Sequence, residues 1–374
     1  MLTPFDEYPV HQSPEPIARP AAGHPDFYDR FWFSGFREDL YFAAAMGVHQ
    51  NREILDAAFA VVHDGIQRSV FYSGRLPRDR RSLTAGPITI GIVEPFAINT
   101  LGVDAPEHGL HADLTYTAHT PVIEESRQTR YHGPQLWMDA TRATQFGSWA
   151  GTLTAGSTQL SVTHLTGVKD RSWGYRAVDQ TASARPASPQ AFFLWAPLQF
   201  DDVALHAMAF EDSDGLPWAA TAASVPVSEL DAITDWTAGT TGTQHYRAVS
   251  HKLSWAIGTR RPSAASLAFH RVDGGTDTID LEPRLTFRMR GAGYGHPTWR
   301  HGSWHGDHEV GGECHAVEEL DTLDPANIHV QQVVRAKWGA RHGIGVLETA
   351  AIGAHRPSGL TGLLDGAAIQ VAHQ

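Results

Sequence analysis

The sequence predicts an all-β protein with two domains, and three observations lead to this prediction. The chain has 374 residues, more than a single hydrophobic core usually supports. Along most of its length, short runs of alternating apolar and polar side chains are separated by turn residues, which is typical of strands. Helical periodicity is scarce. Residues 327–337 are the best candidate for a helix, and their valines fit a strand equally well.

Three Asp-Gly pairs predict hairpins between such runs. Asp64-Gly65 separates the run 56–63 from the run 67–72, and Asp214-Gly215 and Asp273-Gly274 each follow another run. Further runs of this kind cover residues 88–96, 110–118, 159–165, 204–211, 267–272 and 285–289. Where the runs are densest they recur every 8–12 residues or so, the spacing of β-barrels and sandwiches.

The segment TASARPASPQ (181–190) combines small residues with two prolines and has no apolar face, so we interpret it as a linker. It divides the chain into an N-terminal domain (1–184) and a C-terminal domain (185–374). Each has a size that suits an eight-stranded barrel with additional segments. No repeat is strong enough to prove a duplication. The proline-rich first 20 residues are expected to lie as extended coil over the surface.

Composition excludes several functions. The net charge of -12 and the absence of a basic run argue against nucleic acid as a partner. Cys314 is the only cysteine, so an intramolecular disulfide and a four-thiolate metal site are impossible. No apolar run approaches the roughly 18 residues of a membrane span. The N-terminus has neither the basic nor the apolar part of a signal peptide, which favours the cytoplasm. Nothing in the sequence indicates an oligomeric state.

The first candidate functional segment is GVKDRSWGYR (167–176). An extended strand would place Asp170 with Ser172 and Gly174 on one face, and Arg171 with Trp173 and Tyr175 on the other. A bulge near Gly174 could bring Asp170 and Trp173 together. In an apolar pocket, desolvation would raise the pKa of Asp170 and keep it protonated as an acid. The alternative is an Asp–Arg pair that holds a barrel corner, with Trp173 in the core.

The second segment, residues 293–308, is rich in glycine, histidine and tryptophan, and its glycines and proline predict strand, turn, strand. His296 and His301 are candidates for acid or base near neutral pH. Alternatively, they hydrogen-bond the backbone of a glycine-rich turn. The spacings of His301, His305, His308 and His315 match no zinc motif, so we expect no metal. The aromatic residues of this segment that could line a pocket are Tyr294, Trp299 and Trp304.

The third segment is residues 132–151, in which Thr141, Gln145 and Trp149 could line a pocket wall. Equally, Asp139 and Arg142 could form a simple surface pair. Nucleophile-elbow, P-loop and dinucleotide-binding motifs are absent from the sequence, and acidic neighbours would raise the pKa of Cys314. We therefore expect no cofactor.

The Asp170-x-x-Trp173-Gly174 element resembles the hydroxyneurosporene synthase (carotenoid 1,2-hydratase) and AttH-like superfamily. In that group such an element ends the first barrel, and a strand that begins with tryptophan opens the second. The corresponding segment here is Trp195-Ala-Pro-Leu-Gln-Phe-Asp-Asp202, which is followed by Glu211 to Gly215. The run 293–304 is similar to a bacterial branch of domains without an assigned activity. The second half departs from the carotenoid enzymes, which argues against a long polyene substrate.

This resemblance implies two consecutive lipocalin-like antiparallel β-barrels. It also implies relatives that hydrate or cyclise isoprenoid and polyketide alkenes; fungal prenyl-phytoalexin hydratases and pericyclases have a similar architecture. Fold does not settle function, however. The positions that match the superfamily pattern are Asp170, Trp173, Gly174 and Trp195.

These observations lead to the hypothesis of a cofactor-independent acid/base enzyme that acts on a lipophilic isoprenoid-type substrate. Asp170 would protonate an alkene or an allylic hydroxyl, and His301 would accept a proton from water. The rings of Trp173 and Trp304 would stabilise the cation by about 2 kcal/mol. Hydration, dehydration, isomerisation or cyclisation would follow, depending on water access. The expected substrate-binding residues, near the domain junction, are Trp173, Tyr175, Trp149, Gln145, Trp195, Tyr294, Trp299 and Trp304.

Two alternatives remain open at this point. A pericyclase-like enzyme would only hold its substrate in a reactive conformation and transfer no proton. A non-catalytic carrier would bind a small lipophilic molecule with an apolar lining and a few polar groups.

Overall fold

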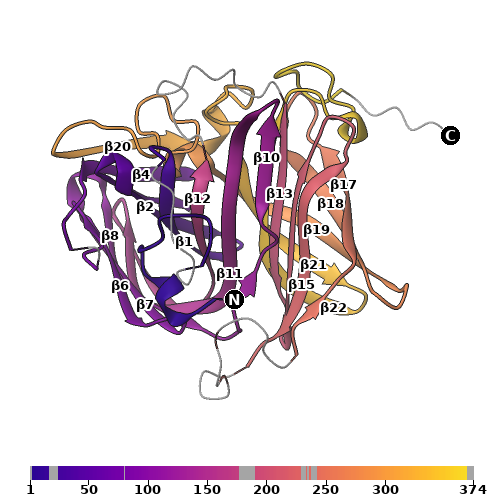
Figure 1. Ribbon diagram of the computed structural model, residues 1–374, viewed down its shortest axis with the longest axis horizontal. Helices are drawn as coiled ribbons and strands as arrows, with labels where there is room; N and C mark the ends of the chain where they lie inside the picture. The colour runs from indigo at the N-terminus through magenta and orange to yellow at the C-terminus, as the bar shows by residue number, and fades with distance from the viewer. Residues whose placement is uncertain are drawn as a thin grey trace.

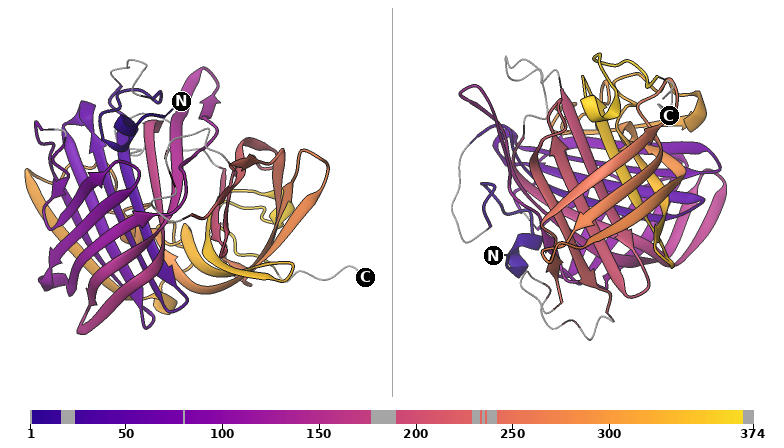
Figure 2. Two further views of the ribbon diagram at one scale, coloured as in Figure 1. Left: turned by 90° about the horizontal axis from the view of Figure 1, so that it is seen from below. Right: turned by 90° about the vertical axis from the view of Figure 1, so that its right-hand side faces the viewer.

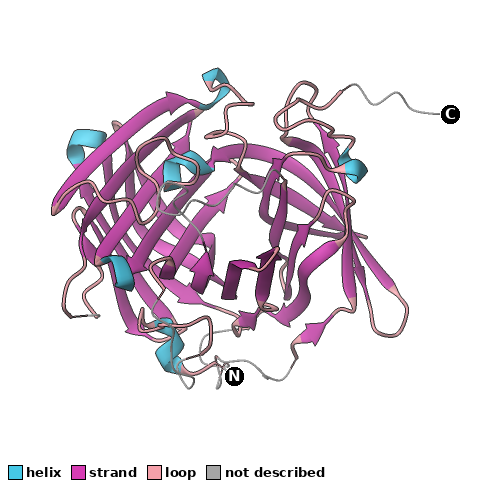
Figure 3. Cartoon of the chain, turned by 45° about the horizontal axis from the view of Figure 1, so that its top comes forward, coloured by secondary structure: helices cyan, strands magenta, loops and turns pink. Residues whose placement is uncertain are grey.

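The computed structural model describes residues 2–16, 24–79, 81–176, 190–228, 233, 236 and 242–368. The described chain is nearly all β, with only short 3-10 helices between the strands (Figure 3). These helices are η1 (Pro4–Glu7), η2 (Gln50–Arg52), η3 (Pro106–His108), η5 (Met289–Ala292), η6 (Val317–Glu319) and η7 (Arg356–Ser358). The predicted all-β class is confirmed. No helix within the described ranges is long and apolar enough to cross a membrane.

The strands form two large, curled antiparallel sheets. The first has 13 strands, in the order β20 (His308–Ala316), β4 (Ile66–Arg75), β3 (Ile54–His63), β2 (Leu40–His49), β1 (Phe27–Arg37), β12 (Thr158–Arg176), β11 (Gln135–Ala155), β8 (Leu110–Ala118), β7 (Ile98–Ala105), β6 (Ile88–Glu94) and β5 (Thr84–Ala85), with β9 (Ile123–Glu124) and β10 (Gln128–His132) beside β11. The second has nine, in the order β16 (Gln244–His245), β15 (Pro217–Pro226), β14 (Val203–Glu211), β13 (Ala191–Gln199), β22 (Arg341–Ile352), β21 (Val330–Trp338), β19 (Thr276–Arg288), β18 (Pro262–His270) and β17 (Ala248–Trp255).

The predicted hairpins are present. Strands β3 and β4 pair from Ile54 to Arg75 around Asp64 and Gly65, whose φ angles are both positive, as a tight two-residue hairpin turn requires. The ambiguous segment 327–337 contains strand β21 rather than a helix, because its valines lie in a sheet between β19 and β22. The predicted linker 181–190 lies outside the described residues, apart from Gln190.

Strand β20 follows seven described strands of the second sheet along the chain, yet it pairs with β4 of the first (Figure 1). The segment before it is not the strand, turn, strand that we predicted. After the helix η5, which ends at Ala292, residues 293–307 form turns and irregular backbone, and the first strand begins at His308. The prediction was wrong because Gly293, Gly295, Gly302 and Gly306 all adopt positive φ, which folds the backbone into successive turns.

Three apolar clusters hold the sheets together. One fills the inside of the first sheet and another the inside of the second. The third lies between the sheets and contains Trp32 and Phe36 of the first together with Trp195 and Phe287 of the second. The two sheets therefore pack against each other through a common core (Figure 2). This junction contains the candidate site.

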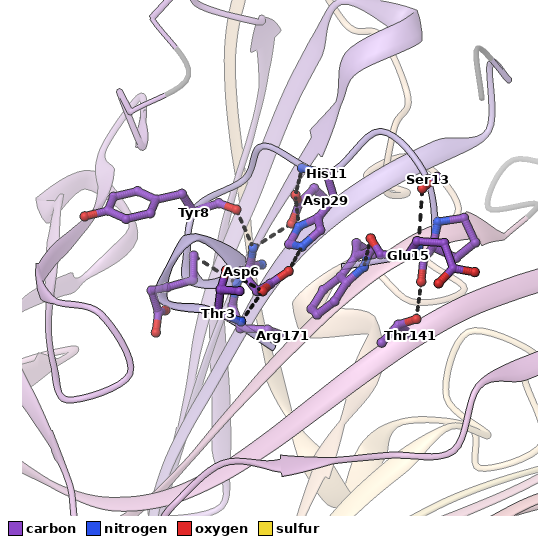
Figure 4. A network of polar contacts seen from close by, with 12 residues as sticks. Thr3, Asp6, Tyr8, His11, Ser13, Glu15, Asp29, Thr141 and Arg171 are labelled. Atoms are coloured by element: carbon purple, nitrogen blue, oxygen red, sulfur yellow. Dashed lines mark hydrogen bonds and ion pairs between the residues drawn. The ribbon is translucent and has the colours of Figure 1, made fainter. Parts of the chain in front are cut away.

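The N-terminal segment does not lie on the surface as extended coil, so that prediction was wrong. Leu2, Asp6, Glu7 and His11 are buried. They meet charged residues of the first sheet: His11 contacts Asp29 of β1, and Glu7 pairs with Lys169 of β12 (Figure 4 shows the former). Buried charges need partners of opposite sign, and the segment supplies them for the sheet.

Candidate functional site

A small cavity lies between the two sheets, with a volume of about 20 Å³. That is room for about one water molecule. Its lining comprises Arg30, Trp32, Arg142, Asp170 and Ser172 from the first sheet, and Trp195, Met289, Tyr294, Gln331 and Glu348 from the chain after β12. The wall thus combines aromatic rings with charged and amide groups from both halves of the sequence.

Alternation along strand β12 places Asp170 at the cavity. Asp170 and Ser172 face the second sheet, whereas Lys169 and Arg171 point the opposite way, to the N-terminal segment. Arg142 lies on the neighbouring strand β11, and its Nε atom is 3.0 Å from Oδ2 of Asp170. Its N–H bond is not aligned for a hydrogen bond, so the contact is an ion pair only.

The carboxyl group of Asp170 has an unusual pKa. Burial raises it to about 6, although the charge of Arg142 acts in the opposite direction. Among the residues that the structure describes, none donates a well-aligned hydrogen bond to Asp170 that would stabilise its ionised form. A carboxylic acid with this pKa can both hold and release a proton near neutral pH.

A second buried carboxylate, Glu125, lies behind Arg142. It accepts hydrogen bonds from Thr144 and Gln128 at 3.0 and 3.1 Å, and it lies 3.0 Å from His206 of the second sheet. Burial opposes the ionisation of Glu125, but Arg142 and His206 lower its pKa overall. The negative charge of Glu125 in turn contributes to the raised pKa of Asp170.

The opposite wall is built around Glu348 of β22. One of its oxygens lies 2.5 Å from Nε2 of His329, and the other accepts a hydrogen bond of 2.6 Å from Gln331. Tyr41 of the first sheet donates to the side-chain oxygen of Gln331. This chain of contacts connects the two sheets directly beside the cavity.

Tyr294 and Arg30 close one side of the cavity. Arg30 donates a hydrogen bond of 2.5 Å to the Tyr294 hydroxyl and lies over its ring. The other Nη atom of Arg30 is 2.9 Å from Nε2 of His301, whose Nδ1 atom is 3.4 Å from Asp56. Burial and the charge of Arg30 lower the pKa of His301 to about 4. The neutral imidazole therefore accepts from Arg30 and holds it in place.

Of the residues singled out from the sequence, the cavity brings together Asp170, Trp195 and Tyr294. His301 reaches it through Arg30. His296 lies apart: it contacts Glu313 at 3.1 Å and accepts hydrogen bonds from the backbone of Thr298 and Trp299.

The remaining aromatic and amide candidates lie elsewhere. Trp173 stacks on His11 at 3.8 Å, on the face of β12 opposite Asp170. The expected bulge near Gly174 is absent, since β12 stays in register with both neighbours there. Trp149 lies in the core of the first sheet, and Gln145 donates to the carbonyls of Phe96 and Thr120.

Three others do not line the Asp170 cavity either. Tyr175 is buried against His24, and Trp299 stacks on Phe71 at 5.9 Å. Trp304 is exposed, with Arg75 over its ring.

Sequence reasoning missed Arg30, Trp32, Gln331 and Glu348. A usable signal was present for Arg30, which interrupts the aromatic run at the start of β1. A charged residue inside such a run must find a partner in the core. Gln331 and Glu348 carry no comparable signal, because their strands approach Asp170 only through the packing of the two sheets.

A family model described as a family of unknown function (DUF8625) matches residues 2–361. The chain belongs to this family. No curated protein matches the sequence of this DUF8625 member.

Two solved structures resemble the DUF8625 chain. An AttH-like protein of Nitrosomonas europaea has a TM-score of 0.55 at 15% identity, over 87% of this chain and 93% of that one. Kievitone hydratase from Nectria haematococca has a TM-score of 0.51 at 11% identity, over 92% and 97%. At such identities the likeness shows the fold alone, and it confirms the predicted pair of lipocalin-like barrels. The relationship to hydroxyneurosporene synthase stays a prediction.

Proposed function

We propose that this DUF8625 protein is a cofactor-independent acid/base enzyme of the hydro-lyase or cyclase type, with Asp170 as its proton donor. The observation that carries the proposal is a buried carboxyl group, with its pKa raised to about 6, in a cavity between two sheets. Perturbed acids in enclosed cavities are typical of active sites, because burial brings their pKa close to the working pH.

In the proposed reaction, Asp170 transfers its proton to an alkene carbon of the substrate, or to an allylic hydroxyl that leaves as water. A new C–H bond forms in the first case, and a C–O bond breaks in the second. Either step leaves a cation on the substrate and a carboxylate at Asp170. The cavity lining thus gains one negative charge next to the new positive charge of the substrate. The rings of Trp32 and Trp195 in the same wall would stabilise such a cation by about 2 kcal/mol when it is desolvated.

The polar part of the lining indicates the kind of substrate. Four buried N–H groups on lining residues have no hydrogen-bond acceptor among the described residues: Arg30 Nε, Trp32 Nε1, Arg142 Nε and Trp195 Nε1. Unpaired buried donors are costly, and an oxygen atom of a ligand would satisfy them. We therefore propose a lipophilic, prenyl-type substrate with an oxygen function near the reacting double bond.

The small volume bears on the mechanism as well. A cavity of about 20 Å³ admits such a substrate only when lining side chains move aside. Tyr294 and Arg30 hold each other and lie on one side of the cavity, so we propose that their displacement opens it. Once the site closes over the substrate, water access decides between hydration and cyclisation. The likeness in fold to kievitone hydratase supports the choice of reaction class.

The test uses the full chain and a panel of prenylated phenols and terpenoid alkenes in deuterium oxide. With the wild type we expect a product with a new C–D bond, or loss of an allylic hydroxyl. Asp170→Asn keeps the shape of the side chain and removes the acid, so the C–D bond should not form. Ser172→Ala is the matched control, since Ser172 lines the same cavity from the same strand. This control should retain activity.

Other outcomes would replace the proposal. Turnover that Asp170→Asn leaves unchanged would exclude Asp170 as the acid, and turnover without deuterium in the product would favour a pericyclase-like enzyme. Tight binding without turnover of any compound would favour a carrier.

A further inference from the structure

A larger cavity, of about 630 Å³, opens at the ends of the β1–β2 and β3–β4 hairpins, beside β19. Its wall contains the apolar side chains of Val62, Leu285 and Val317 and three arginines, Arg261, Arg284 and Arg288. None of the described residues lines both this cavity and the Asp170 cavity. An inference about it therefore stands apart from the proposed acid/base function.

The guanidinium of Arg288 is buried, and no described residue of opposite charge pairs with it. Only 3% of Arg288 is exposed. Its Nη1 atom donates to the carbonyl of Asn327 at 2.9 Å, and its Nε atom has no acceptor in the described part of the chain. The charged neighbour that affects it is another cation, Arg261. Burial and Arg261 together lower the pKa of Arg288 to about 10, so the side chain remains charged at neutral pH.

Among the described residues, three other buried arginines form ion pairs with carboxylates, whereas Arg30 donates to Tyr294 and His301 instead. Arg260, next to Arg261 in sequence, binds Asp365 and several backbone carbonyls. Arg171 pairs with Asp29, and Arg142 with Asp170. Within the described ranges, Arg288 and Arg261 form no ion pair with any carboxylate. An unpaired buried charge such as that of Arg288 is strongly unfavourable, so Arg288, with the half-buried Arg261 beside it, is suited to bind an anion from outside the chain.

Four carboxylates line the cavity, and none of them forms an ion pair with Arg288 or Arg261 among the described residues. Glu318 has no basic partner there, and basic side chains hold the other three. Glu38 binds Arg335 at 2.5 Å, Asp39 binds Arg37 at 2.6 Å, and Asp64 lies 3.3 Å from His63.

We propose that this cavity binds a small organic oxyanion. Its carboxylate or phosphate group lies against Arg288 and Arg261, and its apolar part against Val62, Leu285 and Val317. Guanidinium groups suit this role because their planar set of N–H donors matches the oxygens of both groups.

The test is a calorimetric titration of the full chain at low ionic strength with octanoate, acetate and inorganic phosphate. Octanoate should bind more tightly than acetate, because its chain contacts the apolar wall. The affinity for phosphate, which has no apolar part, measures the contribution of the arginine charges alone. Arg288→Gln should weaken binding of the anions about tenfold or more, since hydrogen bonds to charged groups are among the stronger ones. Arg284→Gln is the matched control. Arg284 lines the same cavity but pairs with Glu282 at 2.6 Å, so its replacement should leave affinity unchanged.

A second measurement does not depend on the choice of anion. Without added anion, Arg288→Met should raise the melting temperature, because it removes an unpaired buried charge. Octanoate should raise the melting temperature of the wild type and not of Arg288→Met. The proposal is overturned if the wild type binds none of the three anions at millimolar concentration. It is also overturned if Arg288→Gln and Arg284→Gln weaken binding equally. Equal stabilisation of the wild type and Arg288→Met by the anions would overturn it as well, because it would show a general salt effect.

Discussion

The carboxyl group of Asp170 lies 3.0 Å from the guanidinium of Arg142, and yet its pKa is higher than that of an exposed aspartate. Burial outweighs the nearby positive charge. Arg142→Met removes the charge and keeps most of the volume, so the pKa of Asp170 should rise further, by about 1 unit or more. The titration of the Asp170 carboxyl carbon, followed by NMR in selectively labelled protein, measures this shift.

Glu125 provides a test of opposite sign. Its negative charge helps to raise the pKa of Asp170, so Glu125→Gln should lower that pKa. If both variants moved the titration in the same direction, or neither moved it, the electrostatic account of the site would be wrong. A pH–rate profile should shift in the same sense once a substrate is known.

The strands and hairpins were predictable because their signals are local. The Asp64-Gly65 turn and the alternation of Asp170 and Arg171 follow from the residue types alone. The position of β20 was not predictable, since its pairing with β4 joins residues more than 230 positions apart. The Asp170 cavity was half predictable. Asp170, Trp195 and Tyr294 were identified, whereas Glu348 and Gln331 reach it only through the packing of one sheet on another.

The same distinction explains the aromatic residues that lie elsewhere. Trp173 and Trp149 are residue types that suit a pocket wall, but strand alternation places Trp173 on the face of β12 opposite Asp170. Trp149 lies in the core of the first sheet and pairs with Leu165, five residues before Asp170. A register shift of one residue would exchange the faces.

The imidazole of His11 lies between two buried carboxylates, 2.7 Å from Asp6 and 2.9 Å from Asp29 (Figure 4). It also stacks on Trp173. Burial acts to lower the pKa of His11, and nearby Arg171 does so as well, but the carboxylates raise it overall. Because the folded-state pKa is raised, His11 contributes stability that is fully present below its unfolded pKa of about 6.5. This contribution is lost as the pH rises through the folded-state pKa.

The measurement is the free energy of unfolding by urea, from pH 6 to 9, for the wild type and His11→Gln. The difference between the two proteins should be largest at pH 6 and should shrink as the pH rises. His111→Gln is the control, since the side chain of His111 is 53% exposed. A constant difference across this range would show that His11 is not protonated in the folded protein.

The buried pair of Glu7 and Lys169 should hold the N-terminal segment in place. Oε2 of Glu7 lies 2.5 Å from Nζ of Lys169 and also accepts from the backbone of Phe96. Glu7→Gln leaves Lys169 without a counter-charge and should cost about 3 kcal/mol of stability. The double variant with Lys169→Met should cost less than the sum of the two single changes. Urea denaturation of all four proteins measures the coupling, and strict additivity would contradict it.

Gly174, four residues after Asp170, holds the end of β12 against β11. Its φ of +134° belongs to a region that residues with a side chain rarely adopt, and a Cβ atom there would lie 2.3 Å from the carbonyl oxygen of Asp139. Gly174→Ala should therefore lower the free energy of unfolding by about 3 kcal/mol, through backbone strain and a clash that only separation of the strands relieves.

Gly65→Ala is the matched control, because Gly65 also has positive φ but has no described atom within 4 Å of the added Cβ. It should cost only about 1 kcal/mol, the penalty of the left-handed conformation. Equal losses in urea denaturation would mean that φ alone matters at Gly174. A larger loss for Gly174→Ala, together with a changed Asp170 titration, would show that the close approach of β11 and β12 maintains the Asp170–Arg142 geometry.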